Sequence, residues 1–91
     1  MKALMQIKNF FIPFYQDLFV IESFELIEHN HLKNMRVNYR FTGKRKVIMS
    51  KTLTEIMDDK KLLNCFSRDN CAELGLWYGR IKELNRVSEH V

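Results

Sequence analysis

The sequence predicts an α+β fold in which a small antiparallel sheet of two or three strands packs against C-terminal helices. Residues 35–42 alternate between apolar and polar side chains, which is the period of a half-buried strand. Gly43 and a second apolar run at 47–49 indicate a central hairpin that spans residues 35–50. After Ser50 the apolar residues recur at helical spacing instead.

The composition is that of one small domain covering residues 1–91. Hydrophobic residues make up 46% of the chain and charged residues 29%, and a single proline and three glycines argue against disorder. Seven Phe, three Tyr and one Trp are a large aromatic supply for a core of this size. Part of that apolar surface is therefore expected to pack against a second copy in a homodimer, the commonest symmetric assembly.

The N-terminal third admits two interpretations. Residues 2–12 carry apolar side chains at helical spacing and are expected to form a short helix that Pro13 ends. Residues 14–20 fit either a helix or a strand, whereas residues 23–28 favour a strand that leads into the hairpin. One continuous helix that ends at Glu28 is the alternative, and the sequence leaves it open.

The register of the hairpin follows from its apolar face. Opposed residues of an antiparallel pair share a face, so an odd-length loop is needed to keep apolar residues together. A three-residue loop at 41–43 satisfies this, with Gly43 in the left-handed conformation that glycine tolerates. The residues predicted to pair across the hairpin are Val37 with Val47 and Met35 with Met49.

The opposite face of the hairpin is basic. No Asp or Glu occurs between Glu28 and Glu55, so the formal net charge of +4 is concentrated in the hairpin. The candidate nucleic-acid-binding residues are Arg36, Arg40, Lys44, Arg45 and Lys46. Cationic side chains on a β-ribbon suit a nucleic acid, another polyanion or an acidic protein partner. The alternative is that they only keep an exposed sheet edge soluble.

The C-terminal half is predicted to be helical. Thr52 and Glu55 have the spacing of a capping box, and a short helix is expected to follow. Asp58 opens a second short turn, and Ser67 is the expected N-cap of the last helix. The predicted inward stripe of that helix is Cys71, Leu74, Tyr78, Ile81 and Leu84.

A second candidate site lies on this last helix. Its residues are Gly75, Trp77, Tyr78 and Gly79. Two glycines inside a helix each cost about 1 kcal/mol relative to alanine, so close approach of another backbone is expected there. Trp and Tyr are common anchors of protein interfaces. The face is therefore either a contact with a partner or ordinary packing against the sheet.

Catalytic and metal chemistry lack a pattern in this chain. His29 and His31 share an i, i+2 spacing that matches no structural zinc motif, and Cys65 and Cys71 are too few for a disulfide framework. No paired carboxylates, nucleophile triad or phosphate-binding glycine loop can be placed. We expect no enzymatic activity, no cofactor, no metal and no small-molecule substrate.

The expected location is the cytoplasm. The first twenty-one residues are apolar enough to suggest a signal peptide, but polar residues interrupt the run and no small-residue cleavage site follows. Reduced cysteines agree with that compartment, and no membrane association is expected. The sequence favours a small non-enzymatic protein that binds nucleic acid or another polyanion through its basic hairpin. The alternative is a protein–protein adaptor or homodimeric accessory subunit that uses the last helix.

Overall fold

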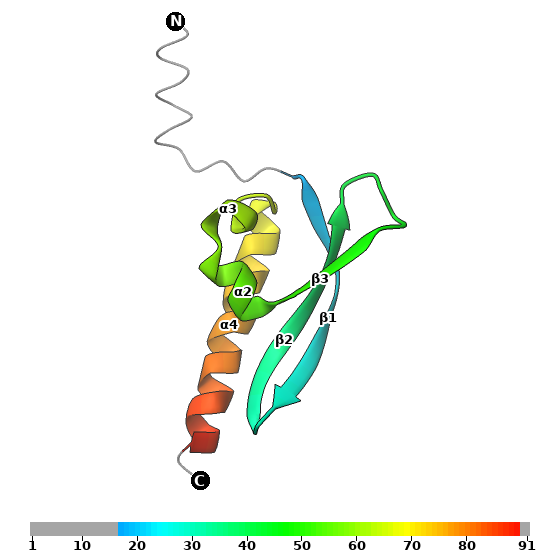
Figure 1. The fold of residues 1–91 in the computed structure, drawn as a ribbon. Helices are drawn as coiled ribbons and strands as arrows, with labels where there is room; N and C mark the ends of the chain where they lie inside the picture. The colour runs from blue at the N-terminus through cyan, green and yellow to red at the C-terminus, as the bar shows by residue number, and fades with distance from the viewer. Residues whose placement is uncertain (1–16, 90–91) are drawn as a thin grey trace, which may run out of the picture.

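The computed structural model describes residues 17–89, which form a three-stranded antiparallel sheet with helices on one of its faces (Figure 1). The elements are β1 (Phe19–His29), β2 (Leu32–Phe41), β3 (Ile48–Thr52), α2 (Leu53–Asp58), α3 (Lys60–Leu63) and α4 (Arg68–Glu89). β2 is the central strand, between β1 and β3. The predicted α+β class is confirmed. The helix predicted at 2–12 lies outside the described residues.

The longest strand pairing joins β1 to β2. The strand predicted at 23–28 is confirmed but is longer, and the alternative of one helix ending at Glu28 is wrong for the residues described. The tight turn of this hairpin is formed by Asn30 and His31, with φ of 52° and 68°. A two-residue turn with two positive φ values matches the right-handed twist of the strands that it joins. The sequence pattern predicted a strand leading into the 35–50 hairpin but did not identify the tight hairpin between β1 and β2.

The pairing of β2 with β3 keeps the predicted faces but not the predicted register. Tyr39 pairs with Met49, and Val37 pairs with Lys51 instead of Val47. The shift is by four residues, an even number, so residues that remain in β3, such as Met49, stay on their expected face, whereas Val47, predicted to point inward, lies outside the strand and is exposed. The predicted three-residue loop is wrong, because Phe41 still belongs to β2 and the connection comprises residues 42–47.

Two contacts explain why the strand extends to Phe41. Its ring packs on that of Phe19 with 4.7 Å between centroids, and the two residues pair across β1 and β2. Gly43 has a φ of 85°, as its left-handed conformation in the prediction requires. The N–H of Lys44 donates to the carbonyl oxygen of Phe41 at 3.0 Å and closes a turn around Gly43. Because Phe41 contacts β1, which is distant in sequence, it stays in the strand, and the loop begins at residue 42 instead of 41.

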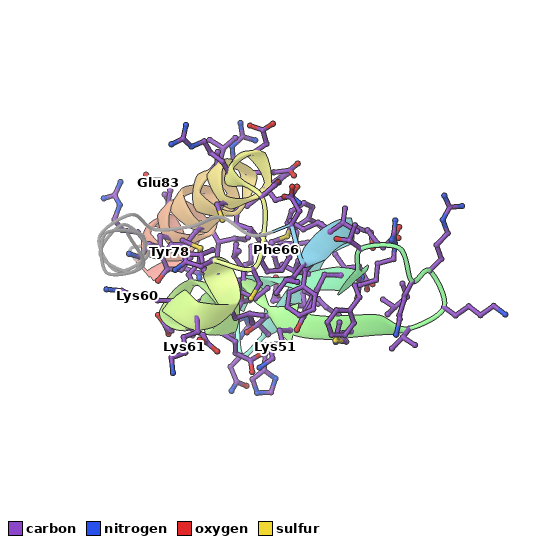
Figure 2. The ribbon with its side chains drawn as sticks, turned by 90° about the horizontal axis from the view of Figure 1, so that it is seen from above. Lys51, Lys60, Lys61, Phe66, Tyr78 and Glu83 are labelled. Carbon is purple, nitrogen blue, oxygen red and sulfur yellow. The ribbon has the colours of Figure 1, made fainter. Side chains whose placement is uncertain are left out.

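The core lies between the sheet and the helices. The inner side chains of β2, Met35, Val37 and Tyr39, are buried as the alternation predicted. Phe66, which follows α3, is fully buried and lies between the helices and the sheet (Figure 2). The remaining buried residues come from α2 and α4 and are Leu53, Ile56, Leu74 and Ile81. The rings of Phe66 and Tyr39 meet edge to face at 5.5 Å, a geometry that aromatic pairs prefer.

The start of α2 is fixed by the predicted capping box. The Thr52 Oγ1 accepts a hydrogen bond from the N–H of Glu55 at 3.3 Å, and the Glu55 carboxylate accepts one from the N–H of Thr52 at 2.9 Å. The N–H of Thr52 and its hydroxyl, which donates to the same carboxylate at 2.8 Å, favour the charged form and hold the pKa of Glu55 below its ordinary value. The amide groups of Thr52 and Glu55 at the helix start are thereby satisfied.

Helix α4 has a capped start and is bonded to strand β2 near its other end. The Oγ of Ser67 accepts from the N–H of Asn70 at 3.1 Å, in agreement with the N-cap predicted there. Near the other end, the Asn85 side chain accepts from the N–H of Lys33 at 2.7 Å and donates to the Lys33 carbonyl oxygen at 2.9 Å. Leu74 and Ile81 are buried between these two points. The helix is thus held against the central strand β2.

Candidate functional site

The outer face of the sheet, away from the helices, is polar. Arg36 and Arg40 alternate along β2 with buried side chains and lie on this face, as the period of the strand predicted. Each cation of β2 lies beside a carboxylate of β1. The ion pairs between these strands are Glu22–Arg40 and Glu25–Arg36 at 3.6 Å on the outer face, and Glu28–Lys33 at 3.3 Å, whose residues have the strand parity of the inner face.

A hydrogen-bond network fills the space between these ion pairs. The Asn38 amide donates to the Ser23 hydroxyl at 3.0 Å and to the Glu25 carboxylate at 2.7 Å. Its carbonyl oxygen accepts from the hydroxyl of Ser50 on β3. The network therefore joins all three strands, and the outer face is an internally paired polar layer instead of an uncompensated basic one.

The sequence reasoning missed this pairing because it summed charge along the chain. Glu22, Glu25 and Glu28 precede the basic segment and were counted with another part of the molecule. The signal that could have found them is their place in a strand that runs directly into the hairpin. Consecutive antiparallel strands place such residues opposite one another. The acidic strand and the basic strand are thus neighbours in the sheet.

The basic residues of the β2–β3 loop have a different environment. Lys44, Arg45 and Lys46 are exposed, and none of the ion pairs formed within residues 17–89 includes them. The base of the loop is fixed, because the N–H of Thr42 donates to the Leu18 carbonyl oxygen at 2.9 Å. Beyond that point the loop projects past the sheet (Figures 1 and 2). We call residues 43–47 the cationic loop.

The cationic loop has a concave side. A shallow hollow of about 470 Å³ is lined by Gly43, by the three basic residues and by Val47. Of the five predicted nucleic-acid-binding residues, the structure therefore brings three together in a loop and places two in the paired outer face. The two groups occupy different surroundings although they are adjacent in sequence.

The residues predicted as an interface on α4 do not form a single surface. Trp77 lies near Phe24 of β1, with 6.0 Å between ring centroids, and Arg80 lies over the indole at 5.4 Å. Tyr78 is the next residue and therefore points about 100° away around the helix. The Lys82 ammonium lies over its ring at 4.7 Å. Trp77 and Tyr78 therefore lie on two different sides of the helix and contact different neighbours.

The close approach expected at the two glycines of α4 is absent from the described part of the chain. A Cβ added at Gly75 or Gly79 would meet no atom within 4 Å. The prediction that the sheet packs closely on these glycines is therefore wrong. Contact with a partner at this face stays a prediction.

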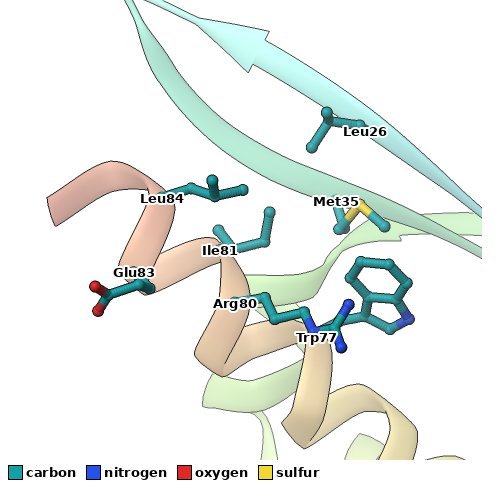
Figure 3. A pocket seen from close by; sticks show the side chains of 7 residues that line it. All are labelled: Leu26, Met35, Trp77, Arg80, Ile81, Glu83 and Leu84. Atoms are coloured by element: carbon teal, nitrogen blue, oxygen red, sulfur yellow. The ribbon is translucent and has the colours of Figure 1, made fainter. Parts of the chain in front are cut away.

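An apolar groove lies between α4 and the β1–β2 hairpin and was missed by the sequence reasoning. Its volume is about 510 Å³. The side chains that line it are Leu26, Met35, Trp77, Arg80, Ile81, Glu83 and Leu84 (Figure 3). Most of these residues were predicted as core, and the periodicity of a strand or helix cannot show that two apolar faces fail to meet fully.

The histidines and cysteines do not assemble into a reactive cluster in residues 17–89. His29 and His31 are exposed at the β1–β2 turn, and no group of three potential ligands that could hold a metal lies within that range. Cys65 and Cys71 are free thiols. Burial raises the pKa of Cys71, and its Sγ donates to the Leu63 carbonyl oxygen at 3.1 Å. The raised pKa reflects desolvation, which disfavours the charged thiolate.

Among the described residues, no helix is both long and apolar enough to span a bilayer. Comparison of the chain with protein-family models, with curated proteins and with solved structures finds no match. The assignment of function therefore depends on the surfaces described above.

Proposed function

We propose that this chain is a non-enzymatic binding protein that contacts the phosphate backbone of a nucleic acid through the cationic loop. The observation that carries the proposal is the contrast in pairing. Lys44, Arg45 and Lys46 are three consecutive exposed cations without a carboxylate partner in residues 17–89, whereas the cations of β2 are paired with β1. Unpaired cations attract phosphates without first giving up an internal ion pair.

The mode of binding follows from the size of the site. Three cations neutralise about three phosphates, so the logarithm of the binding constant should fall with the logarithm of salt concentration with a slope of about −3 for duplex DNA. The hollow of the loop contains no acidic side chain. Because phosphate contacts carry no sequence information, the binding should depend little on base sequence.

The experiment compares two triple variants of equal charge. The loop variant is Lys44→Ala/Arg45→Ala/Lys46→Ala, and the control is Lys51→Ala/Lys60→Ala/Lys61→Ala. The control lysines are exposed and lie on another part of the molecule from the loop, Lys51 on β3 and Lys60 and Lys61 on α3 (Figure 2). Both variants lower the net charge equally, so any difference between them reports the location of the charge.

Fluorescence anisotropy with labelled mixed-sequence duplex DNA and single-stranded RNA measures the outcome over a range of salt. We expect the loop variant to lose affinity by about 10-fold or more and to have a nearly flat salt dependence, while the control keeps most of its slope. Equal losses in the two variants would contradict the proposal. So would a wild-type chain that binds neither nucleic acid at low salt.

A further inference from the structure

Strand β1 has a long free edge. It is an outer strand of the sheet, and it pairs with β2 along its whole length. On its other side only Phe19 is engaged by a described segment, through a bridge to Phe66 and a hydrogen bond of 3.0 Å to the Cys65 carbonyl oxygen. From Val20 to His29 that edge carries no partner strand within residues 17–89. An unpaired edge of this length is a template for another strand.

The inner face of the same strand is incompletely covered. α4 is anchored over β2, and the apolar groove remains open above β1 (Figure 3). Leu26 of β1 is 59% exposed and Leu84 of α4 is 46% exposed, and both line the groove. A free backbone edge and an uncovered apolar strip therefore adjoin one another.

The charges of β1 do not oppose pairing of two such edges. Charged side chains on an edge strand normally repel a second copy. Here each glutamate of β1 is paired with a cation of β2. These cations reduce the repulsion between the two copies, which is smallest in a register where no glutamate faces its own copy.

We propose that a second copy of this chain docks on β1, so that the two β1 strands pair antiparallel and join two three-stranded sheets into one. The two-fold axis is then perpendicular to the sheet, and the two α4 helices lie on the same face, on either side of the joint. A symmetric contact of this kind uses the same patch twice. It satisfies the free edge and closes the apolar groove in a single step, independently of any nucleic acid.

The bulge in β1 selects the register. The pairing with β2 is irregular between Ile21 and Ser23, and a bulge disturbs the regular spacing that a new partner strand needs. The regular segment is 23–29, whose centre is Leu26. With Leu26 on the axis, two leucines face each other on the helix side and Glu25 faces Ile27. Placing the axis at Glu25 or Glu28 would instead oppose two identical carboxylates, which is unfavourable.

The test uses the full chain and a matched pair of leucine variants. Leu26 and Leu76 are both 59% exposed, but only Leu26 lies in the groove. Sedimentation equilibrium should give twice the chain mass of 11.0 kDa for the wild type and for Leu76→Lys. Leu26→Lys should shift the dissociation constant upward by about 10-fold or more, because two lysines would face each other on the axis. Circular dichroism checks that both variants are folded.

A cysteine variant tests the register. It also provides an independent test of the dimer in case the lysine variant does not fold. Opposed residues of an antiparallel pair have Cα atoms about 4.5–5.5 Å apart, within the range of about 4.4–6.8 Å that a disulfide spans. Mild oxidation of Leu26→Cys should therefore give a covalent dimer that neither the wild type nor Leu76→Cys gives. A wild type that is monomeric at every concentration overturns the proposal, whichever other segment or ligand then fills the groove. A dimer that Leu26→Lys leaves intact while Leu76→Lys disrupts it overturns the proposal as well.

Discussion

The cationic loop and the outer face of the sheet have the same kind of residues and opposite electrostatic environments. Both were assigned to one basic surface by the charge pattern of residues 33–51. In the folded chain the outer face receives two carboxylates from β1, Glu22 and Glu25, and the loop receives none from the described residues. The loop projects beyond the last pair of β2 with β3, and β1 ends its pairing at Phe41. The cations of the loop therefore lie beyond the end of β1, the strand that carries the glutamates.

The comparison shows that charge belongs to a surface and not to a stretch of sequence. Two unit charges about 4 Å apart attract by about 4 kcal/mol at the effective dielectric constant near a protein surface, and by much less through water. A carboxylate on the neighbouring strand therefore determines whether an arginine attracts an external anion. The same pairing holds β1 against β2, so the outer face contributes to the structure and the loop is free to bind.

The largest effect on binding is expected when the carboxylates that pair with the outer-face arginines are removed. Glu22→Gln/Glu25→Gln releases Arg40 and Arg36 and raises the net charge of +4 by two. Two further cations should steepen the logarithmic salt slope of nucleic-acid binding by about 2 and raise affinity by about 10-fold at low salt. Anisotropy titrations with labelled duplex DNA measure both quantities.

The control for this gain is Asp58→Asn/Glu73→Gln, which makes the same change in net charge at two exposed carboxylates that none of the ion pairs within residues 17–89 includes. If both double variants strengthen binding equally, the overall charge governs affinity and the distinction between loop and outer face has no functional meaning. If neither does, the pairing with β1 is not what keeps the β2 arginines from binding.

A smaller effect is expected on stability when Arg40 is removed. Its side chain is only 18% exposed and its guanidinium is paired with Glu22. Arg40→Ala loses that charged hydrogen bond and the packing of the aliphatic stem, at a cost of about 1–2 kcal/mol in the free energy of unfolding. Lys46→Ala in the exposed loop should change it by less than about 0.5 kcal/mol. Urea denaturation of the two variants measures the difference, and similar values would contradict the assignment of the outer face to structure.

The smallest effect concerns the backbone of the loop. A Cβ at Gly43 would meet no atom within 4 Å, yet its φ of 85° disfavours any other residue. Gly43→Ala should therefore destabilise the chain by about 1 kcal/mol. Gly79 has equally open surroundings but lies within α4, so Gly79→Ala should stabilise it by about 0.5–1 kcal/mol. Thermal denaturation checks the opposite signs, and a stabilising Gly43→Ala would mean that the loop adopts another conformation.

Local patterns predicted the elements that depend on local physics. The alternation in β2 identified Met35, Val37 and Tyr39 as core, and the Thr52–Glu55 spacing identified the start of α2. These signals are complete within a few residues, because side-chain period and capping act between near neighbours. The same holds for the positive φ of Gly43, since only the turn itself requires it.

The predictions that needed a distant contact were the ones that changed. The β2–β3 register shifted because Phe41 packs on Phe19 of β1. The basic surface was divided in two because β1 supplies its glutamates to only part of it. The glycines of α4 met no neighbouring backbone, because α4 lies on the sheet through Leu74 and Ile81 instead.

The sequence by itself determined the class of fold, the inner and outer faces of the strands and the boundaries set by capping, since periodicity and hydrogen-bond demand are properties of adjacent residues. Only the tertiary structure decided which cations are free, where the apolar layers fail to meet and which strand edge is left without a partner. Those features depend on distances between residues far apart in the chain. They are also the features on which both proposed binding surfaces depend.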